Sequence, residues 1–160
     1  MIVYVSKFLD RISDLFVALI CAGIAVMTVI NGFNIIWRAV FDSEPGPILP
    51  WTVAIFIWTV FLGFFPMVHE GRDVSLEYLR ERVSAPALLA MDVVTDLIML
   101  IVALLIFSQV GKIISMQVGT VPLVGFERYW LSVPLFVSCG FIALEVALRL
   151  LKRFSNRETV

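Results

Sequence analysis

Four long apolar stretches alternate with short polar segments along the chain. The first two uncharged runs cover 15–37 and 45–68, and the second begins its helix near residue 50. The third apolar run continues past Asp92 and Asp96 to Ile114, and the fourth covers 129–148. About 20 apolar residues in a helix cross a bilayer. The pattern therefore predicts an all-α integral membrane protein with four transmembrane helices at about 15–37, 50–68, 93–114 and 129–148.

Two flanking segments have apolar residues at helical spacing but carry many charges. The segment 3–14 places Val5, Leu9 and Ile12 on one face, with charged residues opposite. The segment 72–84 has an apolar stripe and an acidic stripe. We expect both to be short amphipathic helices lying at the membrane interface or under a partner.

Composition agrees with a single membrane domain over 1–160. The chain is 61% hydrophobic and 16% charged, with mean hydropathy +1.00, whereas soluble domains average about 45–50% apolar and about 25% charged residues. The net charge of -1 argues against a nucleic-acid partner. One histidine and two cysteines, Cys21 and Cys139, are too few for the usual haem or zinc sites. We therefore expect no catalytic residue, cofactor or metal, and no enzyme activity.

Basic residues are distributed unequally between the two sides that four spans would define. Three belong to the segments after the first and third spans: Arg38, Lys112 and Arg128. The other nine belong to the two termini and the segment after the second span. The positive-inside rule then places both termini in the cytoplasm.

Five ionisable residues lie near the ends of the predicted spans: Arg38, Asp92, Asp96, Glu145 and Arg149. Charges at membrane depth often mark an ion or proton pathway. Here Asp92 and Asp96 occupy early turns of one helix, where anions are favoured, and Glu145 and Arg149 are spaced i, i+4. We favour pairing between helices over ion coupling, with Arg149 either bound to Asp96 or extended to lipid headgroups.

The opposite side of the membrane has its own polar and aromatic candidates. Asn31, Asn34 and Arg38 follow one face of the first helix, which indicates helix packing more strongly than a substrate site. Trp51 and Trp130 begin the second and fourth spans and are typical interface anchors. A substrate site there would draw on Ser108, Gln109 and Lys112, which supply few donors.

The order of several short motifs resembles the small membrane subunit of TRAP transporters, the tripartite ATP-independent periplasmic uptake systems of bacteria and archaea. The motifs are Trp37-Arg38, Ile48-Leu49-Pro50-Trp51, Phe61-Leu62-Gly63, Gly71-Arg72-Asp73-Val74 and Tyr129-Trp130-Leu131-Ser132-Val133-Pro134. Two features differ from the family. Thr52 and Val53 stand where glutamates often follow the tryptophan, and Asp73-Val74 replaces a frequent His-Ile, so roles tied to those residues are not transferred.

The resemblance implies a scaffold that works with two other proteins in the cytoplasmic membrane. A large multi-span subunit would move the solute with sodium ions, and a periplasmic binding protein would deliver an organic acid anion. The small subunit would enlarge and anchor the static part of the large subunit within the lipid. It would also offer part of the periplasmic surface on which the binding protein docks. Sodium would bind in the large subunit and not in this chain.

Two self-contained membrane proteins are the alternatives. A multidrug exporter needs a carboxylate at mid-membrane, and the first two spans have none. A four-helix membrane thiol enzyme needs a nucleophilic cysteine, whereas both cysteines lie in apolar runs. The transported solute is not indicated by the sequence.

Overall fold

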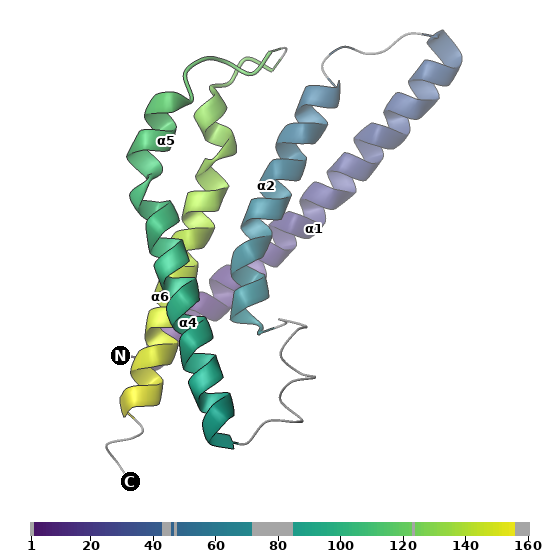
Figure 1. The fold of residues 1–160 in the computed structure, drawn as a ribbon. Coiled ribbons are helices and arrows are strands. Elements are labelled where there is room, and N and C mark those ends of the chain that lie inside the picture. Colours follow the sequence, from purple (N-terminus) through teal and green to yellow (C-terminus); the bar gives the residue numbers. More distant parts are fainter. Residues whose placement is uncertain (1, 43–45, 47, 72–84, 123, 156–160) are drawn as a thin grey trace.

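The structure, a computed structural model, describes residues 2–42, 46, 48–71, 85–122 and 124–155 (Figure 1). Four of its helices are long and apolar enough to cross a membrane, which confirms the predicted all-α class with four spans. The elements in chain order are α1 (Ile2–Phe41), α2 (Ile48–His69), α4 (Ala85–Ser108), α5 (Val110–Met116), the 3-10 helix η1 (Arg128–Leu131) and α6 (Val133–Ser155).

Proline and glycine mark several helix ends. Pro50 and Pro134 occupy the first turns of α2 and α6, where a backbone N–H has no intrahelical acceptor to lose. After α2, Gly71 adopts φ +63°, and its N–H donates to the Val68 carbonyl at 3.3 Å. Glycine suits this left-handed position because it has no Cβ. The fourth predicted span begins with the short 3-10 helix η1 and continues as α6.

The third span is not one continuous helix. It divides at Gln109 into α4 and α5, where the Gln109 N–H donates to the Ile106 carbonyl at 3.1 Å, a tight i to i−3 bond. The Ser108 hydroxyl also donates to the Leu105 carbonyl at 2.7 Å, and such back-bonding bends helices. Gly111, a poor helix former, follows directly.

The segment 3–14 is not the separate surface helix that the sequence predicts. It is the first part of α1, which runs without a break from Ile2 to Phe41. No proline or glycine precedes Gly23, so nothing interrupts the helix. Leu9 is fully buried and Phe16 is 6% exposed, so the apolar stripe packs on the other helices. The segment 72–84, expected to be the second amphipathic helix, lies outside the described residues.

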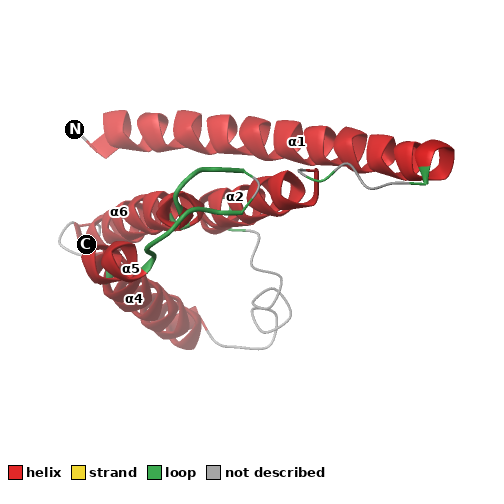
Figure 2. Cartoon of the chain, turned by 90° about the horizontal axis from the view of Figure 1, so that it is seen from above, coloured by secondary structure: helices red, strands yellow, loops and turns green. Residues whose placement is uncertain are grey.

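The four long helices form a row in the order α1, α2, α6, α4. Contacts join α1 to α2, α2 to α6 and α6 to α4, and Figure 2 shows α1 and α4 at opposite edges. Phe16, Phe65 and Phe141 pack together with ring centroids 5.3–5.7 Å apart. Beyond this core α1 leans away from the other helices (Figure 1).

Candidate functional site

Charged residues join the helices at the end of the row near both termini, which we call the terminal end (Figure 1). On α6, Arg149 Nε donates to Glu145 Oε1 at 3.0 Å. Arg149 Nη2 donates to the carbonyls of Val68 and His69 at 2.5 and 3.1 Å. The last carbonyls of a helix lack an intrahelical donor. Arg149 therefore caps α2 and ties it to α6.

The imidazole of His69 lies between two carboxylates from different helices. Its Nε2 is 3.0 Å from Asp10 Oδ1 on α1, and its Nδ1 is 3.2 Å from Glu145 Oε2 on α6. A neutral imidazole carries one N–H, so both contacts are hydrogen bonds to ionised carboxylates only when both nitrogens are protonated. The ring also packs on Phe65, with centroids 5.5 Å apart. His69 thus connects α1, α2 and α6.

A second ion-pair group links α4 to α6. Arg153 Nη2 donates to Asp92 Oδ2 at 3.3 Å and lies 3.4 Å from Asp96 Oδ2, without hydrogen-bond geometry in the latter case. Asp96 is 5% exposed. The expected pairing of Asp96 with Arg149 is therefore replaced by pairing with a residue one turn further along α6. Arg149 is already bound to Glu145 and to α2.

The side chains of His69, Asp10 and Arg153 were not among the sequence candidates. Each could have been suspected from its place within one turn of an uncharged run or beside another charge. Their partners depend on how each helix is rotated about its axis, and the sequence pattern does not define that rotation.

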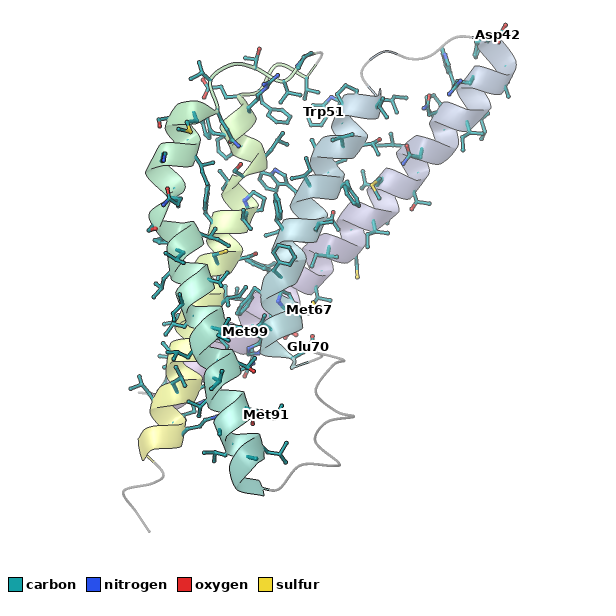
Figure 3. The ribbon with its side chains drawn as sticks, viewed as in Figure 1. Asp42, Trp51, Met67, Glu70, Met91 and Met99 are labelled. Atoms are coloured by element: carbon teal, nitrogen blue, oxygen red, sulfur yellow. The ribbon has the colours of Figure 1, made fainter. Side chains whose placement is uncertain are left out.

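The predicted interface tryptophans lie at the opposite end of the row. Trp130 accepts, through its backbone carbonyl, a hydrogen bond of 3.1 Å from Trp58 Nε1. The rings of Trp51 and Phe126 are 6.0 Å apart, and Figure 3 shows Trp51 at the upper end of α2. These contacts fasten η1 and the preceding loop to α2.

The polar stripe of α1 does not converge with the polar residues of the third span. Thr52 Oγ1 is 3.5 Å from Asn31 Oδ1, a long contact, and donates more closely to its own helix at 3.0 Å. Asn34 Oδ1 is buried without a hydrogen-bond partner, and Arg38 is exposed near the end of α1. Ser108, Gln109 and Lys112 belong to the other edge of the row.

Within the described ranges, no group of three or more His, Cys, Asp or Glu side chains could hold a metal ion. Asp73 lies outside those ranges. Chemically, the terminal-end groups pair acids with bases and cap backbone carbonyls. They hold helices together at fixed positions.

The profile of one family, described as the DctQ component of the tripartite ATP-independent periplasmic transporters, matches residues 27–156. The match includes α2, α4 and α6 and the part of α1 from residue 27 onward. No curated protein and no solved structure matches the chain.

Proposed function

Because the chain belongs to the DctQ component of the tripartite ATP-independent periplasmic transporters, we propose that it is the membrane scaffold of its transporter. The family consists of transporter subunits, so the chain is the small permease component and not an enzyme. Its partners in this proposal are a large membrane subunit and a periplasmic binding protein. The large subunit carries an organic acid anion with sodium ions across the cytoplasmic membrane.

One observation supports the scaffold role above all others. The row of helices leaves a broad apolar surface on its outer helix α4, much of it about half exposed: Val94, Leu97, Ile98, Ile101, Val102 and Leu105. A row of helices offers more side surface to a neighbour than a closed four-helix bundle does. Such a surface suits a subunit that covers a larger one within the lipid.

The end of the row opposite the termini supports a contact with the binding protein. In the loop between α5 and η1, the Val121 N–H donates to the Phe126 carbonyl at 2.8 Å, and Arg128 N–H donates to the Gly119 carbonyl at 3.0 Å. Thr120 pairs with Glu127 in an isolated bridge. These bonds join the two sides of the loop at 119–121 and 126–128, and order of this kind before docking lowers the entropy cost of binding a partner.

Reconstitution tests the proposal. Liposomes with a sodium gradient and the cognate binding protein should show no uptake of labelled dicarboxylate, sialic acid or sulfonate when this chain is the only membrane component. Adding the large subunit should give uptake of one of these solutes. Uptake by this chain alone would contradict the scaffold role.

A further inference from the structure

An apolar groove runs between α1 and α2 in the half of the row away from the terminal end. Its deeper part is a hollow of about 440 Å³ between Leu19 and Gly23 on α1, Ala54 and Leu62 on α2, and Trp130 of η1. A second hollow of about 340 Å³ lies between Phe33 of α1 and Ile48 of α2. Trp51 lines both hollows.

The deeper hollow has about the depth of one membrane leaflet. From Trp51 to Leu62 it follows α2 for about 17 Å at about 1.5 Å per residue, and half of a hydrocarbon core of about 30 Å is about 15 Å. Trp51 lies in the first turn of α2. The hollow therefore runs from the interface to about the middle of the bilayer.

The walls of the deeper hollow are almost entirely apolar. Two of the polar side-chain groups among its lining residues are bonded within the protein. The Thr59 hydroxyl donates to the Ile55 carbonyl at 2.8 Å, and Trp58 Nε1 donates to the Trp130 carbonyl. The occupant of the groove is consequently a hydrocarbon.

Phe33, which lines the second hollow, continues into a series of aromatic rings toward the end of α1. Phe33, Trp37 and Phe41 form a ladder of rings on α1, with centroids 5.6 and 4.3 Å apart, and tryptophan prefers the headgroup level. Arg38 lies beside this ladder in sequence. A guanidinium has five donors, so it can bind a phosphate while keeping the contact that it already makes.

We infer that this groove binds one phospholipid, with an acyl chain between α1 and α2 and the phosphate at Arg38. This site does not depend on the proposed transport role. It belongs to the chain itself, and a bound lipid would occupy the two hollows between α1 and α2.

Native mass spectrometry of the full chain in detergent tests the inference. After delipidation, the protein is titrated with a phosphatidylethanolamine, a phosphatidylglycerol and the matching diacylglycerol. We expect one phospholipid to be retained per chain. Leu19→Trp, which fills the deeper hollow from a residue that is 48% exposed, should reduce retention at least fivefold.

Ile101→Trp is the matched control, because Ile101 is also 48% exposed but lies on α4. It should retain lipid as the natural chain does. Arg38→Gln should weaken phospholipid retention and leave diacylglycerol retention unchanged. Ala54→Phe provides a second filling variant should Leu19→Trp fail to fold.

Equal lipid retention in a folded filling variant and in the control would overturn the inference. Loss of the large subunit from a filling variant that keeps its lipid would also overturn it, because the groove would then receive a protein segment.

Discussion

Arg149 and Arg153 are one turn apart on α6 but bind different helices. Arg149 contacts Glu145 and the end of α2, whereas Arg153 contacts Asp92 and Asp96 on α4. The burial of Asp96, 5% exposed, makes its pairing costly to remove. These contacts assign each arginine to one neighbouring helix.

Double-mutant cycles should separate the two arginines. The cycle of Arg153→Ala with Asp96→Asn should give a coupling of about 1 kcal/mol in the free energy of unfolding, because the Arg153 side chain is only partly exposed. The cycle of Arg149→Ala with Asp96→Asn should give less than about 0.5 kcal/mol. Thermal unfolding in detergent measures both. The reverse order of couplings would contradict the observed pairing.

The two carboxylates that contact His69 should differ in their importance. The Asp10 side chain is 56% exposed and that of Glu145 is 14% exposed. Asp10→Asn should change stability by no more than about 0.5 kcal/mol. Glu145→Gln should cost about 1.5–3 kcal/mol, because it removes the charged acceptor of both His69 and Arg149. Equal losses in the midpoint of thermal unfolding would contradict this account.

At the scale of the helices, α1 packs closely against α2 at Gly23. A Cβ added there would lie 2.7 Å from Thr59 Oγ1, a distance that real Cβ atoms essentially never show. The missing side chain therefore allows the two helices to pack closely in the membrane. Gly32, nine residues further along α1, has nothing within 4 Å of such a Cβ.

Gly23→Ala should destabilise the protein by about 1–3 kcal/mol through overpacking. Gly32→Ala is the matched control and should be neutral or stabilising, because alanine favours a helix by up to about 1 kcal/mol over glycine. Combining Gly23→Ala with Thr59→Ala should recover part of the loss. Chemical or thermal unfolding in detergent gives the comparison. Equal effects of the two glycine substitutions would argue against the close contact.

The sequence pattern predicts some features of the helices and not others. Long apolar runs predicted the four spans, because the bilayer imposes a length and an apolar surface on each helix that crosses it. The break at Gln109 was not predicted, since it depends on local hydrogen bonds of Ser108 and Gln109. The pairing of Asp96 with Arg153 was missed because a shift of one turn along α6 leaves the sequence pattern unchanged.

At the scale of the whole molecule, both termini lie at one end of the row and the loop that holds Thr120 lies at the other (Figure 1). An even number of spans produces this arrangement whichever way the protein is inserted. Orientation must therefore come from charge. Nine of the twelve basic residues belong to the termini and to the segment between α2 and α4.

Cysteine labelling tests that orientation. Cys21 and Cys139, which lie in α1 and α6, are first replaced by alanine. In intact cells, Asp42→Cys and Thr120→Cys should react with a membrane-impermeant maleimide, because the few basic residues beside them favour translocation. Ser75→Cys should react only after the membrane is permeabilised, because Arg72, Arg80 and Arg82 retain its segment in the cytoplasm. Labelling of Ser75→Cys in intact cells, with Thr120→Cys protected, would reverse the orientation and move the terminal-end ion pairs to the outside.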